Sequence, residues 1–532
     1  MPSELPFIFD PDPDPAPDSG DAGIGTPTLP PPVYPADDAG AAPPAGIEGF
    51  RDMNEYLREL AALDMPAARK AAILGTLYRD GVDTVEARLP ALSEIYLPIP
   101  RRPRQVIREM QDALEMLATL LLDPDGRTNE NYDPPPGDGI APLALWRVLH
   151  LLSRHLLISS LTAAPPGAGI WRRLHRAYSI AVRQGVTHEL PEGATISLRD
   201  KYYAAVLLGC AQPTSFTGPE VLFLDTYLGS FAEQVETGQG RPEDSPVAFW
   251  IDPQSDRPAT PYSRKPPTPD TPVHSFSCQR LASLLESQLA ALDAGAVPDS
   301  IGVPAFAATP AGIGVLNRLV QLWGNPGKRR FPRRRQNRRV DLCLGFDKLC
   351  RLYKGASPGV DASSWMITNE SPDGYAVMHL SGETRSITAG NVVALRTESA
   401  EDWLLCIIRW VLSENQEHIE LGLQILASRA YAADIALPAE PPPAGESPAI
   451  VESGTVAESR PALILPATPL IRPNEALVVR SGALAGRSKD LVLVIERDNV
   501  EIREIGSLHC DERNGLIELY GIAPGEKEAG AG

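Results

Sequence analysis

Prolines are concentrated in a few stretches of this 532-residue chain and divide it into segments that fold separately. Half of the 54 prolines lie within residues 1–45, 238–275 and 438–459. Proline removes a backbone N–H and interrupts helices and central strands. Residues 1–45 also repeat aspartate, cannot bury a core, and are predicted to be a disordered leader. Because hydrophobic residues make up 43% of the chain, the segments between can hold cores, and a multidomain α+β protein is expected.

The segment after the leader is predicted to be helical. From residue 46 to residue 237 apolar residues recur at helical spacing, with Leu57 and Leu60 on one face. This pattern predicts an N-terminal α-helical bundle or degenerate helical array over 46–237. Residues 238–323 are predicted to form a proline-rich loop followed by two helices, with one short extended candidate at 247–251.

The chain becomes strand-like after the turn signal Gly-Asn-Pro-Gly at residues 324–327. Several alternating apolar runs predict a β-domain over residues 324–432. A second proline-rich linker is predicted over 433–460, a small all-β domain over 461–523, and a disordered tail over 524–532.

Charge and cysteine usage limit the class of protein. The formal net charge of −19 argues against general binding to nucleic acid or to an anionic membrane surface. The six cysteines form no Cys-x-x-Cys pair, and the N-terminus resembles no secretory signal. The most apolar helical stretch carries arginines and histidines and is too polar to insert into a membrane. We therefore expect a cytoplasmic protein, and the sequence indicates no catalytic site, metal site or cofactor.

A basic cluster stands out against this acidic background. Eight basic residues lie within twelve positions: Lys328, Arg329, Arg330, Arg333, Arg334, Arg335, Arg338 and Arg339. Arginine donates bidentate hydrogen bonds to phosphate and to the O6/N7 edge of guanine. The cluster alone is equally consistent with a solvated linker or a non-specific RNA site. A strand candidate follows it directly at residues 340–346.

A second motif lies about thirty residues after Arg339, at residues 369–374, Asn-Glu-Ser-Pro-Asp-Gly. Arg-x-x-x-Arg followed by a strand, a loop and Asp/Asn-x-Ser-x-x-Gly resembles the signature of the PilZ family. The strand patterns after residue 374 also resemble that family, so the resemblance covers about 100 residues. It implies a central PilZ-type β-barrel over 324–432. The stretch between residues 350 and 364 is longer than a minimal barrel needs and indicates an insertion.

The resemblance to PilZ proteins implies a ligand, cyclic di-GMP, and the residues that bind it. The arginine pair is Arg335 with Arg339, or in the alternative register Arg334 with Arg338. In the second motif the expected ligand-binding residues are Asn369, Ser371 and Gly374. Asn369 is expected to bond a guanine edge and Ser371 to support the loop or reach a phosphate, while Gly374 permits close approach or an unusual backbone angle.

The function that follows is a bacterial cyclic di-GMP receptor, not an enzyme. Ligand binding is expected to change how the helical domain interacts with an unknown protein partner, and family analogy suggests motility, attachment or exopolysaccharide control. One alternative is a PilZ-like adaptor that binds protein but no nucleotide. A further alternative is nucleic-acid binding through residues 328–339, which the net charge disfavours.

Overall fold

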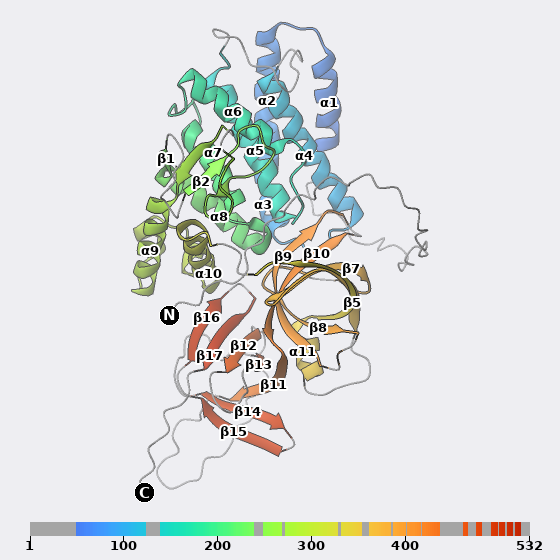
Figure 1. Ribbon diagram of the computed structural model, residues 1–532. Coiled ribbons are helices and arrows are strands. Elements are labelled where there is room, and N and C mark those ends of the chain that lie inside the picture. The colour runs from blue at the N-terminus through green and yellow to red at the C-terminus, as the bar shows by residue number, and fades with distance from the viewer. Residues whose placement is uncertain are drawn as a thin grey trace.

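A computed structural model describes most of the chain between residues 49 and 522 (Figure 1). The described ranges are 49–123, 139–238, 248–268, 272–327, 331–353, 361–384, 387–398, 400, 402–415, 418–436, 461–466, 475–480, 491–497, 499–505, 508–513 and 516–522. The predicted leader, the predicted tail and nearly all of the predicted linker at 433–460 lie outside these ranges.

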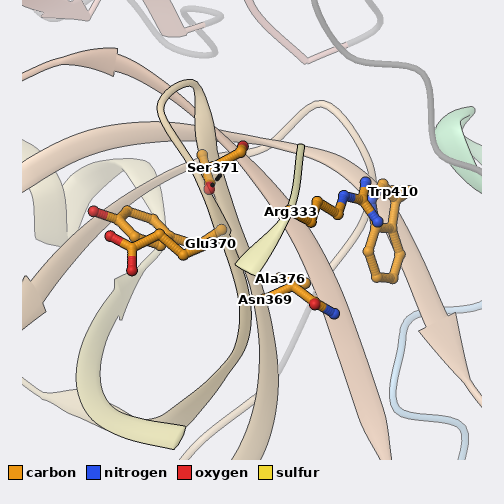
Figure 2. A pocket seen from close by; sticks show the side chains of 8 residues that line it. Arg333, Asn369, Glu370, Ser371, Ala376 and Trp410 are labelled. Atoms are coloured by element: carbon orange, nitrogen blue, oxygen red, sulfur yellow. Dashed lines mark hydrogen bonds between the residues drawn. The ribbon is translucent and has the colours of Figure 1, made fainter. Parts of the chain in front are cut away.

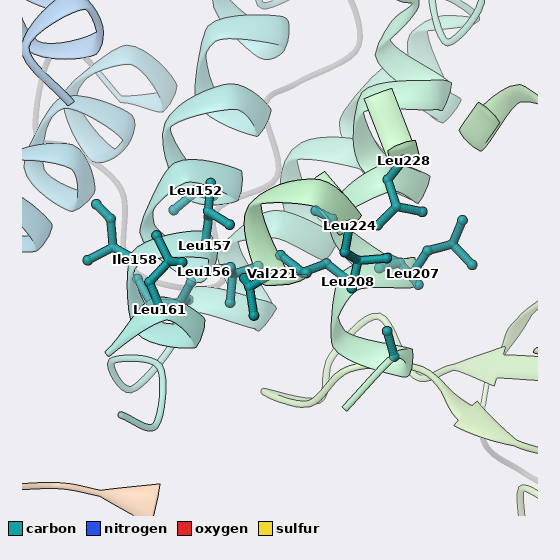
Figure 3. Close-up of a cluster of buried hydrophobic side chains, with 14 of the residues drawn as sticks. Leu152, Leu156, Leu157, Ile158, Leu161, Leu207, Leu208, Val221, Leu224 and Leu228 are labelled. Carbon is teal, nitrogen blue, oxygen red and sulfur yellow. The ribbon is translucent and has the colours of Figure 1, made fainter. Parts of the chain in front are cut away.

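The N-terminal half is helical, as the apolar periodicity predicted. Its helices are α1 (Phe50–Ala62), α2 (Ala67–Glu86), α3 (Leu89–Ser93), α4 (Arg101–Leu122), α5 (Pro142–Leu161), α6 (Ile170–Gln184), α7 (Leu198–Cys210) and α8 (Gly218–Phe231). Helix α5 is apolar on nearly all sides and lies at the centre of the bundle, packed against α4, α6, α7 and α8. Figure 3 shows leucines of α5, α7 and α8 meeting in this core. A capping box between Thr217 and Glu220 starts α8.

A small sheet follows the bundle, in the segment predicted to be mainly loop. It pairs β1 (Glu236–Gly238), β4 (His274–Ser277), β2 (Ala248–Ile251) and β3 (Thr260–Pro261) in that order. The extended candidate at 247–251 corresponds to β2. The other strands are too short to show a pattern. Two further helices, α9 (Gln279–Asp293) and α10 (Pro310–Leu319), match the predicted pair, and a π-helical turn at Val320–Gly324 ends the segment.

Six antiparallel strands then close into a barrel (Figure 1). Around the barrel the order is β10 (Ile419–Ala427), β7 (Gly374–Ser381), β6 (Ala362–Ser371), β5 (Arg334–Leu344), β8 (Val392–Thr397) and β9 (Leu404–Ser413). Alternate residues fill the interior, and Ile419, Leu421 and Leu423 are fully buried. Helix α11 (Phe346–Tyr353) overlaps the start of the stretch between residues 350 and 364 where an insertion was predicted.

The chain leaves the barrel through β11 (Arg429–Ala436) and enters a seven-stranded sheet. Its order is β15 (Asn499–Ile505), β14 (Leu491–Arg497), β11, β13 (Glu475–Arg480), β12 (Pro461–Pro466), β17 (Glu518–Ile522) and β16 (Leu508–Arg513). The C-terminal part is therefore all-β, as predicted. Its sheet also includes β11, which crosses the boundary predicted at residue 432.

The barrel and the helical bundle share one hydrophobic core. A single cluster of buried side chains runs from α1 to barrel residues such as Val340, Trp365 and Leu421. In the described parts of the chain, no helix is both long and apolar enough to cross a membrane.

Candidate functional site

The strand register brings the two predicted motifs together. Strands β5 and β6 are antiparallel neighbours, with Arg335 opposite Asn369 and Arg334 opposite Glu370. The two motifs, about thirty residues apart in the chain, therefore lie side by side at one rim of the barrel. This adjacency follows from antiparallel pairing and could not be read from either motif alone.

A β-bulge separates the arginines into two groups. Two residues of β5 lie between Arg335 and Arg338, whereas a single residue of β6 separates their partners Asn369 and Ile367. Arg339 lies beyond the bulge, opposite Met366. All four predicted arginines, Arg334, Arg335, Arg338 and Arg339, are exposed.

Arg338 forms an ion pair inside the second motif. Its Nη2 donates to Glu370 Oε2 at 2.6 Å, and half of the Arg338 side chain is exposed. An exposed pair of this kind is worth only about 0–1 kcal/mol, because water and salt screen it. A phosphate arriving at this rim could therefore displace Glu370 at small cost.

The turn between β6 and β7 is built by the second motif itself. Ser371 pairs with Gly374 across the turn, and Ser371 Oγ donates to the Gly374 carbonyl at 3.2 Å. A Cβ at position 374 would lie 1.9 Å from the Leu423 carbonyl oxygen. Gly374 is therefore required by the close approach of β10, and its φ is not in the left-handed region.

A shallow depression of about 190 Å³ lies beside this turn. It is lined by Arg333, Asn369, Glu370, Ser371, Gly374, Tyr375, Ala376 and Trp410. Three of the seven predicted residues, Asn369, Ser371 and Gly374, thus line it. None of the four predicted arginines does so, although they lie on the adjoining strand.

Five lining residues were not among the predicted ligand-binding residues, namely Arg333, Glu370, Tyr375, Ala376 and Trp410. Figure 2 shows the Arg333 side chain extending to the ring of Trp410, with Asn369 nearby. Arg333 belongs to the basic cluster but falls outside both Arg-x-x-x-Arg registers. Trp410 lies on β9, far from both motifs in sequence, and only the barrel closure places it here.

The Trp410 ring is positioned by a glycine on the neighbouring strand. Gly422 of β10 pairs with Trp410, and a Cβ on Gly422 would lie 1.7 Å from Trp410 Nε1. The ring therefore lies flat over the Gly422 backbone and is only 3% exposed. No local sequence pattern marks Trp410, because its contact with Gly422 depends on the register of β9 against β10.

The chemistry of this rim suits an anionic ligand with planar groups. Five arginines, Arg333 among them, lie on or beside the depression, and the Asn369 amide can pair with a base edge. Burial raises the pKa of Tyr375, and the Glu370 carboxylate adds to the rise, so the phenol stays a neutral hydrogen-bonding group. The depression is shallow and open to solvent rather than an enclosed cavity, so a large ligand must widen it or extend over the arginines.

Two family models match this chain. Residues 45–242 match the N-terminal domain of the cyclic-di-GMP receptor FimW, and residues 354–431 match its middle PilZ domain. Together the two matches cover just over half of the chain. The second match includes Asn369, Ser371 and Gly374 but begins after the arginine cluster.

One curated relative extends the similarity over most of the chain. The cyclic-di-GMP receptor FimW of Pseudomonas aeruginosa is 20% identical over 465 residues. The alignment covers 72% of this chain and 75% of the relative. All of these matches carry the name cyclic-di-GMP receptor.

Proposed function

This chain belongs to the PilZ-domain family of cyclic di-GMP-binding proteins, and from that premise we propose that it is a cytoplasmic cyclic di-GMP receptor. The depression at the barrel rim, together with the arginines of β5, is the proposed ligand site. Binding there changes how the helical domain meets a protein partner. Motility, surface attachment and exopolysaccharide control are the processes that analogy with the family suggests.

The observation that carries this proposal is the pairing of Arg335 with Asn369. Cross-strand neighbours in an antiparallel pair lie about 4.5–5.5 Å apart at Cα. A guanidinium and an amide at this spacing can bind the phosphate and the guanine edge of the same nucleotide. The two predicted halves of the site therefore act on one ligand.

The residues take separate roles in the proposed complex. Arg335 and Arg339, or Arg334 and Arg338 in the other register, neutralise the two phosphates. Asn369 bonds a guanine edge, and Ser371 holds the β6–β7 turn by its bond to the Gly374 carbonyl. Arg333 and Trp410 offer a guanidinium plane and an aromatic ring to a base, provided that the ligand separates them.

Isothermal titration of the purified full-length chain with cyclic di-GMP tests the proposal, with GTP and cyclic di-AMP as controls. We expect saturable binding of cyclic di-GMP and none of comparable strength for the controls. If the folded protein does not bind cyclic di-GMP, the alternative of a PilZ-like adaptor that binds protein but no nucleotide is favoured. Nucleic-acid binding that falls steeply with salt would assign the arginines to that ligand instead.

A further inference from the structure

One buried arginine of the helical domain holds the barrel at the end of β9. Arg104 of α4 is 7% exposed. Its Nη1 donates to the Ser413 carbonyl at 2.9 Å and to the Glu414 carbonyl at 3.1 Å, and its Nη2 donates to Ser413 Oγ at 2.9 Å. We refer to Arg104, Ser413 and Glu414 as the Arg104 clamp. Its two barrel residues lie 309 and 310 positions away in the chain, so only the tertiary fold brings them to Arg104.

Backbone contacts fix the same end of the barrel on two further sides. The Ser413 N–H donates to the Ala163 carbonyl, just after α5, at 2.8 Å. The Ile387 N–H donates to the Leu97 carbonyl, ahead of α4, at 3.3 Å. Ser413 itself is fully buried. The end of β9 is thus bonded to segments next to both α4 and α5, and it cannot move without moving one of them or breaking these bonds.

The strand that carries the clamp also forms a wall of the ligand site. Trp410 lies on β9 three residues before Ser413, within one unbroken strand. Trp410 is 3% exposed and its ring packs on Gly422, and the depression beside it is shallow and open to solvent rather than an enclosed cavity. A dinucleotide that enters the depression, rather than only covering the exposed arginines beside it, therefore has to displace Arg333 or shift the wall that Trp410 forms.

We propose that the Arg104 clamp couples the ligand site to the helical domain: cyclic di-GMP shifts β9 at Trp410, and the clamp transfers that shift to α4 and to the end of α5. This inference rests on the proposed function and names its route of regulation. Because binding coupling is reciprocal, breaking the clamp must also change the affinity of the barrel for the nucleotide.

Hydrogen exchange and titration of the full chain test the route. In the wild type we expect saturating cyclic di-GMP to change amide exchange in residues 101–108 and 158–164 as well as in the barrel. In Arg104→Gln the change in residues 101–108 should be lost, whereas the change in residues 158–164 should persist through the backbone bond from Ser413 to Ala163. Ser413→Ala removes only the Oγ acceptor of Arg104 and should weaken the change in residues 101–108 without abolishing it. Arg104→Gln should also alter the Kd for cyclic di-GMP by at least about fivefold, the lower end of typical coupling between sites.

Arg102→Gln is the matched control, since Arg102 lies on the same turn of α4 but is exposed. Its Kd and exchange pattern should equal those of the wild type. If Arg104→Gln does not fold, hydrogen exchange in Ser413→Ala and in the wild type still tests whether ligand binding is coupled to the helical domain. If the wild type binds cyclic di-GMP but its exchange changes only in the barrel, the coupling is wrong and the proposed function stands. If the wild type binds no nucleotide, both the proposed function and the coupling are wrong.

Discussion

The guanidinium groups of β5 are the side chains on which the proposed ligand site depends most. Charge-assisted hydrogen bonds contribute roughly 1.5–3 kcal/mol each, and about 1.4 kcal/mol is a factor of ten in affinity. We expect Arg335→Ala or Arg339→Ala to weaken cyclic di-GMP binding at least about tenfold, measured by titration, and Ser371→Ala to weaken it less. If Arg334→Ala and Arg338→Ala abolish binding instead, the alternative register holds. Wild-type affinity in all four arginine variants would remove them from the site.

The Glu370 carboxylate is expected to compete with the ligand for Arg338. It holds Arg338 Nη2 at 2.6 Å on the exposed rim. An exposed ion pair contributes about 0.2–1 kcal/mol. Glu370→Gln should therefore tighten cyclic di-GMP binding by up to about fivefold, with a larger gain at low salt. Glu420→Gln, on β10, which β7 separates from β6, removes the same charge away from Arg338 and is the control. Weaker binding by Glu370→Gln would show that the carboxylate belongs to the binding set.

Lys201 of α7 is expected to make the stability of the helical domain depend on pH. Burial lowers the pKa of Lys201 to about 7, and the charge of Arg154 adds to the lowering. An unfolded lysine keeps its proton to about pH 10.4, so between pH 7 and 10 the unfolded chain binds more protons than the folded one. The free energy of unfolding should therefore rise with pH across this window.

Replacing Lys201 by methionine tests this directly. Lys201→Met should remove the rise and stabilise the chain at pH 7 by roughly 1–4 kcal/mol, as apolar replacements of buried charges often do. Denaturant unfolding at several pH values measures both effects. Lys265→Met, at an exposed lysine, should change neither. Destabilisation of Lys201→Met at pH 7 would mean that the buried ammonium has a stabilising role.

The contact between β7 and β10 depends on the glycine at position 374, which has no side chain. A Cβ on Gly374 would lie 1.9 Å from the Leu423 carbonyl oxygen, which is backbone and cannot rotate away. We expect Gly374→Ala to push the strands apart and to cost about 1–3 kcal/mol of stability, measured by denaturant unfolding. The control is Gly229→Ala within α8, where nothing lies within 4 Å and alanine favours the helix. Equal stability of the two variants would contradict the close approach.

The continuous core predicts how the domains behave when separated. A fragment of residues 324–432 contains all six barrel strands but loses Arg104 and the bundle side chains that pack against the barrel. We expect a β-dominated circular dichroism spectrum and a lower melting temperature than that of the barrel in the full chain. A mainly helical spectrum would contradict the barrel assignment. An unchanged melting temperature would show that the shared core does not stabilise the barrel.

Local sequence patterns were sufficient for the fold class and for three of the eight residues that line the depression. The alternation of Ile419, Leu421 and Leu423 predicted a half-buried strand, because side chains on a strand alternate between its two faces. The motif from Asn369 to Gly374 marked the turn that lines the depression. Such signals lie within a few neighbouring residues, so they can be read before any folding partner is known.

The tertiary structure alone decided which distant residues meet. The bulge that separates Arg335 from Arg338, and the placement of Trp410 over Gly422, follow from strand register across the closed barrel. The bond from Arg104 to Ser413 spans 309 positions. An arginine on a helix and a serine at a strand end carry no mark of their pairing, because their contact depends on how whole elements pack. The sequence therefore determined the elements and the proposed ligand motif, and packing determined which residues line the depression and which bonds join the barrel to the helical domain.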